Sequence, residues 1–164
     1  MLRDKNLVPL SRQHQHALAL CVRIHRAALA SPAEVEAWQS EIQQHFEQEI
    51  QHHFGAEEAY LFPAARRLPE LSALVEELLA DHARLRQYFA QSAARTLDGP
   101  ALWQFAETLS AHLRKEERQL FEGMQKQMKP EELVRIGTQV DEALAAAPEV
   151  CIVPTESTLK TSGG

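Results

Sequence analysis

Two ten-residue segments of this chain share a pattern in which a histidine is followed four residues later by the first of two glutamates. Residues 53–62 read HFGAEEAYLF, and residues 112–121 read HLRKEERQLF. In a helix, side chains four positions apart lie on one face, about 6 Å apart along the axis. Each segment can therefore place an imidazole beside a carboxylate. Two such pairs are typical of metal sites inside helical bundles.

The length and composition fit one globular domain. A chain of 164 residues can bury a sizeable core. No apolar run approaches the ~20 residues of a membrane span, so no membrane association is expected. The net charge of −6, with dispersed lysines and arginines, argues against binding to nucleic acid.

The cysteines and the first residues indicate a reducing compartment. Cys21 and Cys151 lie far apart and form neither a zinc motif nor a redox motif. The opening segment, MLRDKN, leads into no apolar signal sequence, so secretion is not expected. We therefore expect a cytoplasmic protein.

Helical periodicity runs through nearly the whole chain, which predicts an all-α fold. Ser11 is expected to cap the first helix, and the capping box Ser31-Pro32-Ala33-Glu34 starts the second. Pro63 is expected to end that second helix. The predicted helices span about residues 11–30, 32–62, 69–96, 100–126 and 130–145. Four long helices with short connections predict an antiparallel up-down four-helix bundle, and the fifth helix is short.

The domain is expected to cover residues 1–145, followed by a C-terminal tail, residues 146–164, that is either docked or flexible. The chain also looks doubled. Leu10 precedes His14 by four residues in the first predicted helix, as Leu78 precedes His82 in the third. The repeated ten-residue pattern then occupies the second and fourth helices.

The helical phase predicts which polar side chains face the core. At 100° per residue, six of them fall within the apolar stripes, whereas His16, Glu58 and Glu117 are expected to face solvent. Two divalent or trivalent ions would compensate so many buried polar groups, and imidazoles with carboxylates favour iron or manganese. The inward-facing residues are His14, His53, Glu57, His82, His112 and Glu116.

Simpler interpretations exist for each residue alone. A lone histidine on an apolar face is usually a core residue. A single His-x-x-x-Glu is usually a surface pair, as His45 and Glu49 illustrate. The metal hypothesis depends on two matching pairs and two single histidines occurring together.

These motifs resemble the hemerythrin-like domain, the family known by its His-His-Glu cation-binding pattern. The resemblance covers about residues 7–127 and is carried by residues 10–14, 53–63, 78–82 and 112–116. It implies a four-helix bundle around two non-haem iron ions, with two bridging carboxylates and a bridging oxygen species. Glu57 and Glu116 would be the bridges, and the four histidines would be terminal ligands.

The sequence departs from the oxygen-carrying members at one position. Those proteins have five histidine ligands, two of them one turn apart on the third helix, whereas Leu78 and Arg86 flank His82 here. The four-histidine set looks more like bacterial members linked to nitric oxide and oxidative stress. Some of these repair iron–sulfur centres, but the cysteine-bearing N-terminal domain of such repair proteins is absent from this sequence.

The resemblance implies dioxygen, nitric oxide or peroxide as small ligands, and it names no protein partner. A sensor or scavenger is the first hypothesis. The alternatives are a peroxide-reducing, nitric-oxide-reducing or iron–sulfur-repair enzyme, and an iron-storage or oxygen-binding protein.

Several other residues carry less specific predictions. Glu49 is either a proton-transfer group or a surface acid, and Asp81 either orients His82 or is a plain surface acid. His25 faces inward but lies too far along its helix to join the site. The residues expected to serve packing alone are Cys21, Trp38 and Trp103.

Overall fold

The computed structural model describes residues 1–147, 152 and 154–159, and within these ranges the chain is all-helical, without a strand. The all-α prediction is therefore confirmed. In chain order the helices are α1 (Val8–Arg26), α2 (Pro32–His45), α3 (Gln51–Ala56), α4 (Phe62–Arg66), α5 (Pro69–Ala93), α6 (Gly99–Lys115), α7 (Glu122–Gln127), α8 (Pro130–Ala145) and α9 (Glu156–Leu159). Three π-helical segments interrupt them: η1 (Phe46–Ile50), η2 (Glu57–Leu61) and η3 (Glu116–Phe121).

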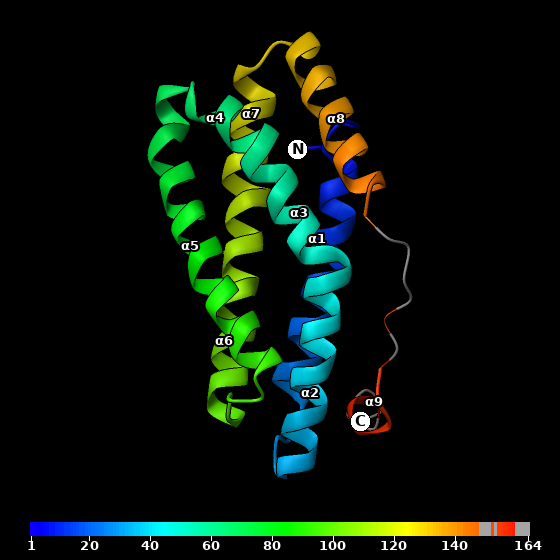
Figure 1. Ribbon diagram of the computed structural model, residues 1–164. Helices are drawn as coiled ribbons and strands as arrows, with labels where there is room; N and C mark the ends of the chain where they lie inside the picture. The colour runs from blue at the N-terminus through cyan, green and yellow to red at the C-terminus, as the bar shows by residue number, and fades with distance from the viewer. Residues whose placement is uncertain (148–151, 153, 160–164) are drawn as a thin grey trace.

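The long helices lie side by side. Figure 1 shows α1, the continuous run from α2 to α4, helix α5, and the run from α6 to α7 beside one another, with the chain turning back after each. The turns lie near residues 27–31, 67–68 and 94–98. Helix α8 packs against α3 and η2 at the upper end of the molecule. None of the helices in the described ranges has an apolar stretch that could cross a bilayer.

Helix starts follow their sequence signals, with one exception. Ser31 Oγ accepts a hydrogen bond from the backbone N–H of Glu34 at 3.2 Å, so the predicted cap of α2 is confirmed. Asp98 caps α6 in the same way, accepting from the N–H of Ala101. The predicted cap at Ser11 is wrong, because α1 begins one turn earlier, at Val8.

The second helix does not end before Pro63 as predicted. The run continues through this proline to Arg66. Pro63 is the second residue after η2, and the N–H of Phe62, between them, bonds to the carbonyl of Glu57 five residues back. The regular α-helical hydrogen bonding is already shifted there, so the missing N–H of proline does not end the helix.

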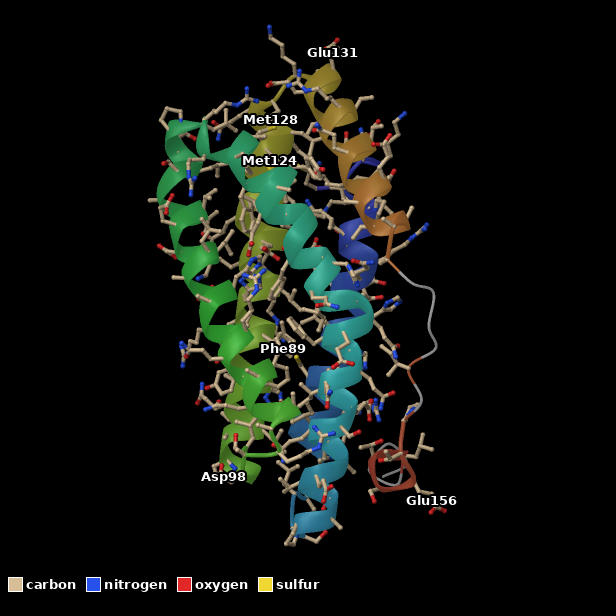
Figure 2. All side chains as sticks on the ribbon, viewed as in Figure 1. Phe89, Asp98, Met124, Met128, Glu131 and Glu156 are labelled. Atoms are coloured by element: carbon tan, nitrogen blue, oxygen red, sulfur yellow. The ribbon has the colours of Figure 1, made fainter. Side chains whose placement is uncertain are left out.

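The buried apolar side chains form two clusters separated along the helix axes. The first includes Met124 and the second includes Phe89, which lie in opposite halves of the molecule (Figure 2). On α1, Leu10 belongs to the first cluster and Ala17 to the second, and His14 lies between them. The two apolar clusters thus lie on either side of a layer of polar residues.

The two tryptophans differ in exposure. Trp38 is fully buried, as predicted. Trp103 is 47% exposed, so its assignment to the core is wrong. Its ring lies 5.0 Å from the ring of the half-buried His25, on the outer surface between α1 and α6. Leu102 and Phe105 of α6 are fully buried and contribute to the core on this side of the helix, whereas Trp103 does not.

Part of the tail packs against α2. Helix α9 contacts α2, and the guanidinium of Arg23 on α1 donates to the carbonyl of Thr158 at 3.4 Å. The same guanidinium pairs with the fully buried carboxylate of Glu41 on α2. Most other residues of the predicted tail, 146–164, lie outside the described residues. The domain boundary at residue 145 stays a prediction.

The Arg23–Glu41 pair predicts a measurable dependence of stability on pH. Burial alone would raise the pKa of Glu41, but hydrogen bonds from His45, Arg23 and Thr158 lower it to about 2. The ionised form is thus favoured by folding. The stability that it contributes is present above pH 4.5 and is lost as the pH falls from there toward 2.

Replacing Glu41 should remove this contribution. Glu41→Gln is expected to reduce the free energy of unfolding by about 2 kcal/mol at pH 7, the scale of a hydrogen bond to a charged partner. The difference from the parent protein should shrink at pH 3. Urea denaturation of both proteins at the two pH values measures it, with Glu36→Gln, an exposed site on the same helix, as the control. A difference that is equal at both pH values would contradict the lowered pKa.

Candidate metal centre

The six residues predicted to face the core meet in one buried layer between the two apolar clusters, and together they are called the polar cluster below. None of them is more than 4% exposed. Each of the long helical runs contributes at least one. They are His14 of α1, His53 of α3, Glu57 at the start of η2, His82 of α5, His112 of α6 and Glu116 at the start of η3.

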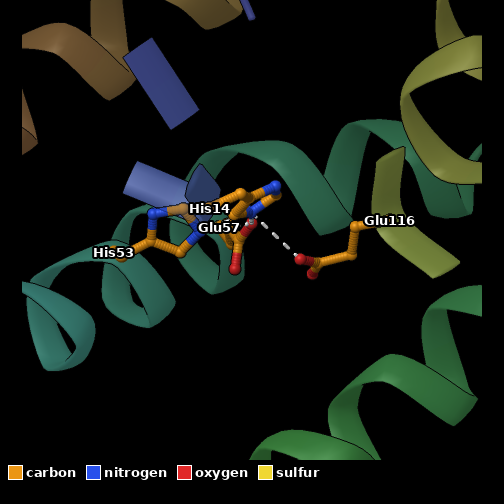
Figure 3. Close-up of side chains that lie close together, drawn as sticks. All are labelled: His14, His53, Glu57 and Glu116. Carbon is orange, nitrogen blue, oxygen red and sulfur yellow. Dashed lines mark hydrogen bonds and ion pairs between the residues drawn. The ribbon is translucent and has the colours of Figure 1, made fainter. Parts of the chain in front are cut away.

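The polar cluster divides into two groups of four residues that share both glutamates. In each group the nitrogen and oxygen atoms that could hold a metal all lie within 4.8 Å of one another. The first group consists of His14, His53, Glu57 and Glu116, and the second of Glu57, His82, His112 and Glu116. Figure 3 shows the first group, with Glu116 reaching toward the other three side chains from a separate helix.

Each glutamate turns one oxygen toward each group. For Glu57, Oε1 faces the first group and Oε2 the second, whereas for Glu116 Oε2 faces the first and Oε1 the second. The distances from Nε2 to the nearest of these oxygens are 3.0 Å for His53 to Glu57, 3.4 Å for His82 to Glu57, 3.2 Å for His14 to Glu116 and 3.2 Å for His112 to Glu116. Carboxylates arranged in this way can bridge two ions.

Every imidazole of the polar cluster has an acceptor at its outer nitrogen, Nδ1. The acceptors are Glu117 Oε1 for His14 at 2.7 Å, Gln13 Oε1 for His53 at 2.8 Å, Glu58 Oε1 for His82 at 2.7 Å and Asp81 Oδ2 for His112 at 3.4 Å. Since these oxygens only accept, Nδ1 carries the proton in the neutral ring. The lone pair of Nε2 then faces the interior, as a metal ligand requires.

That arrangement leaves the interior without hydrogen-bond donors. Two ring nitrogens, Nε2 of His14 and Nε2 of His53, lie only 2.9 Å apart. Both carboxylates are buried with no hydrogen-bond partner on any of their oxygens. Burying an unpaired carboxylate costs several kcal/mol, so positive charge must enter the polar cluster as protons or as metal. Metal fits the spacing, because donors on ~2.1 Å bonds at right angles lie ~3 Å apart.

Without metal, protons supply the positive charge. Burial lowers the pKa of His14, but the carboxylates of Glu116, Glu117 and Glu57 outweigh burial and hold this pKa well above its ordinary value. Burial also lowers the pKa of His112, yet the neighbouring carboxylates, Glu116 first, raise it to about 9. Burial raises the pKa of Glu57, and the surrounding imidazoles nevertheless hold it well below its ordinary value. The polar cluster therefore attracts cations strongly.

Comparison with known proteins agrees with this geometry. A family model described as the hemerythrin HHE cation binding domain matches residues 8–123. The chain belongs to the hemerythrin HHE family. The matched range contains all six residues of the polar cluster. No significant match was found among curated proteins or among solved structures.

The second glutamates of the two repeated patterns do not lie where the sequence prediction for this hemerythrin-family chain placed them. Glu58 and Glu117 were expected to face solvent, but their side chains are only 31% and 25% exposed and contact the imidazoles of His82 and His14. Glu57 and Glu116 begin η2 and η3, and the backbone N–H of each still bonds to the carbonyl of the histidine four residues earlier, so both pairs are α-helical. The second glutamate of each pair lies at the edge of the buried face, and its side chain reaches the outer nitrogen of an imidazole on another helix. The Glu-Glu doublet in both copies of the pattern was the signal for this role.

Asp81 contacts a different histidine from the one considered in the sequence prediction. It lies beside His112 of α6, not beside its own neighbour His82, because consecutive helical residues point about 100° apart. Lys115 donates to the same Asp81 oxygen at 3.0 Å. Gln13 likewise reaches His53 instead of the adjacent His14, a contact that the sequence prediction missed.

The two remaining predictions near the site concern Glu49 and His16. His16 is exposed, as predicted, and its Nδ1 lies 3.2 Å from both carboxylate oxygens of Glu49. Glu49 also lines a cavity of about 10 Å³ beside His14 and His53, large enough for about one water-sized molecule. Its role in proton transfer stays a prediction. His25 lies outside the polar cluster, with its Nε2 3.7 Å from Glu107.

Proposed function

We propose that this hemerythrin-family chain is a non-haem di-iron protein. Glu57 and Glu116 would each bridge both ions, His14 and His53 would complete one ion's protein ligands, and the other two histidines would complete the second. The orientation of the two carboxylates, with one oxygen toward each imidazole pair, is the observation that carries the proposal. The alternating direction of the long helices supports the antiparallel up-down four-helix bundle in which such centres occur.

The donor atoms favour iron over softer metals. The polar cluster offers imidazole nitrogens and carboxylate oxygens, a set that suits iron or manganese. The thiol of Cys21 is buried in the second apolar cluster, which includes Phe89. Burial raises the pKa of this thiol to about 12, so it supplies no thiolate. Among the residues that the structure describes, a copper or zinc site built on sulfur is therefore not supported.

The number of protein ligands leaves room for small molecules. Four imidazoles and two bridging carboxylates supply about eight bonds, fewer than two six-coordinate ions accept. When bound, the iron pair would supply open coordination positions and electrons to dioxygen, nitric oxide or peroxide. The residues of the chain exclude bulk water, hold each imidazole through its Nδ1 partner, and lower the pKa values of both carboxyl groups, which favours their ionised form. Sensing or scavenging of such molecules is the function that this arrangement supports best.

The proposed reactivity can be tested on the reduced protein. After anaerobic reduction, stopped-flow mixing with dioxygen is expected to show complete oxidation within minutes, and nitric oxide is expected to bind readily. Glu116→Ala, which lacks one of the proposed bridging carboxylates, serves as the control and should show neither change. A long-lived adduct that releases dioxygen when its pressure is lowered would instead indicate an oxygen carrier. Repeated turnover with an added electron donor would indicate an enzyme.

A further inference from the structure

The four Nδ1 acceptors around the polar cluster are not chemically equal. Three are carboxylates, and each of these also contacts a cation: Glu117 with Arg3 at 2.7 Å, Glu58 with Arg86 at 2.6 Å and Asp81 with Lys115 at 3.0 Å. The fourth acceptor is the neutral amide of Gln13, which holds His53. One imidazole therefore has a neutral partner where the other three have an anion.

This difference falls at matching positions of the doubled chain. Gln13 directly precedes His14, and Asp81 directly precedes His82. Each reaches across to the histidine of the neighbouring helical run instead of the one that follows it. The other two acceptors, both second glutamates of the repeated pattern, are identical in the two halves. Among the Nδ1 acceptors the halves thus differ only in this pair.

The difference changes how strongly the imidazoles can donate to a metal. A carboxylate at Nδ1 makes a charge-assisted hydrogen bond and raises the basicity of the opposite ring nitrogen, whereas an amide does so much less. The pair His82 and His112 has two anionic partners, and the pair His14 and His53 has one. Loss of such a partner typically costs 10–100-fold in metal affinity.

We propose that Gln13 and Asp81 make the two metal positions unequal. A divalent ion would bind more tightly between His82 and His112 than between His14 and His53, with an affinity ratio of about tenfold. This inference rests on the proposed pair of metal positions. Gln13 and Asp81 act through the imidazoles that they hold, so they are positioning residues and do not contact the ion.

Anaerobic titration of metal-free protein with cobalt(II), followed by its visible absorption, tests the proposal. The parent protein is expected to take up about two equivalents in two resolved steps. Gln13→Glu places a carboxylate at Nδ1 of His53 without changing the size of the side chain, and it should tighten only the weaker step. Asp81→Asn should weaken only the tighter step. Either change should bring the two affinities together.

Matched controls separate this effect from a general change of charge. Gln51→Glu adds the same charge at an exposed site two residues before His53, and Glu77→Gln removes a carboxylate that contacts Lys115 but not His112. Neither should move either step by more than about twofold. Mössbauer spectra of the parent protein loaded with ⁵⁷Fe(II) give a second measurement that needs no variant. Two distinct doublets are expected, and they should converge in Gln13→Glu.

The outcomes distinguish this inference from the function on which it rests. Two equal cobalt steps that neither substitution changes, with one Mössbauer doublet, would overturn the inference and leave the two metal positions intact. A tightening of the stronger step by Gln13→Glu would reverse the assignment and overturn it as well. Uptake of one equivalent or less would overturn the proposed pair of positions and this inference with it.

Discussion

The His14→Ala variant is expected to lose most of its iron, whereas His16→Ala should keep the amount found in the parent protein, about two irons per chain. The two residues are neighbours on α1 but leave the helix about 160° apart by the α-helical angle. His14 is buried, and its Nε2 faces both glutamates of the polar cluster. The side chain of His16 is 62% exposed. Iron is measured by elemental analysis after expression in iron-replete medium.

A second pair of variants tests the same site from another helix. Glu116→Ala should abolish iron binding, because it removes a proposed bridge to both ions. Glu117→Ala should weaken binding about 10–100-fold, because it removes only the acceptor that holds His14 at Nδ1. Iron below half an equivalent in the parent protein, with no gain after anaerobic reconstitution, would refute the proposed centre. If His16→Ala lost its iron and His14→Ala kept it, the face of α1 that points into the core would have been assigned wrongly.

The inward-facing residues could be predicted because the helical period is strict over the segments that carry them. His14 lies between Leu10 and Ala17 on α1, and His112 between Leu109 and Leu113 on α6, so packing of the apolar stripe also buries the imidazole. Because the ten-residue pattern occurs twice, a chance placement of both His-Glu pairs on buried helix faces was improbable. For these residues, local periodicity and tertiary structure agree.

The partners that hold the imidazoles could not be predicted in the same way. Glu58 and Glu117 hold imidazoles that belong to other helices, and a helical projection of their own segments does not show these neighbours. The contacts of Gln13 and Asp81 cross between helices, so they depend on how the helices are rotated against one another. Trp103 was misassigned because an aromatic side chain at a helical position was equated with burial.

Removing iron from the protein is expected to lower its melting temperature by about 10 °C. Binding to the native state alone stabilises it by about 4 kcal/mol when free metal exceeds the dissociation constant about a thousandfold. For a domain of this size each kcal/mol corresponds to roughly 2–4 °C. The metal-free protein, in contrast, must keep the carboxylates of Glu57 and Glu116 close together at 0% exposure. Calorimetry of iron-loaded and chelator-treated protein measures the difference.

The Glu116→Gln variant should abolish that difference without unfolding the protein. Its neutral amide cannot bridge two ions, so added iron should no longer raise the melting temperature. In the metal-free state, burial and the charge of Glu57 both raise the pKa of Glu116, although the imidazoles of His112 and His14 outweigh them. The substitution removes the repulsion between the two carboxylates, so the metal-free variant should melt no more than a few degrees below the metal-free parent.

Glu131→Gln provides the control for this last experiment, because Glu131 is exposed on α8, at the far end of the molecule (Figure 2). Its iron-dependent shift in melting temperature should equal that of the parent protein. If Glu116→Gln retained the full shift, Glu116 could not be a ligand, and the second carboxylate of any bridge would have to come from elsewhere. If the parent protein itself melted at one temperature with and without iron, the positive charge in the polar cluster would have to be carried by protons instead of metal.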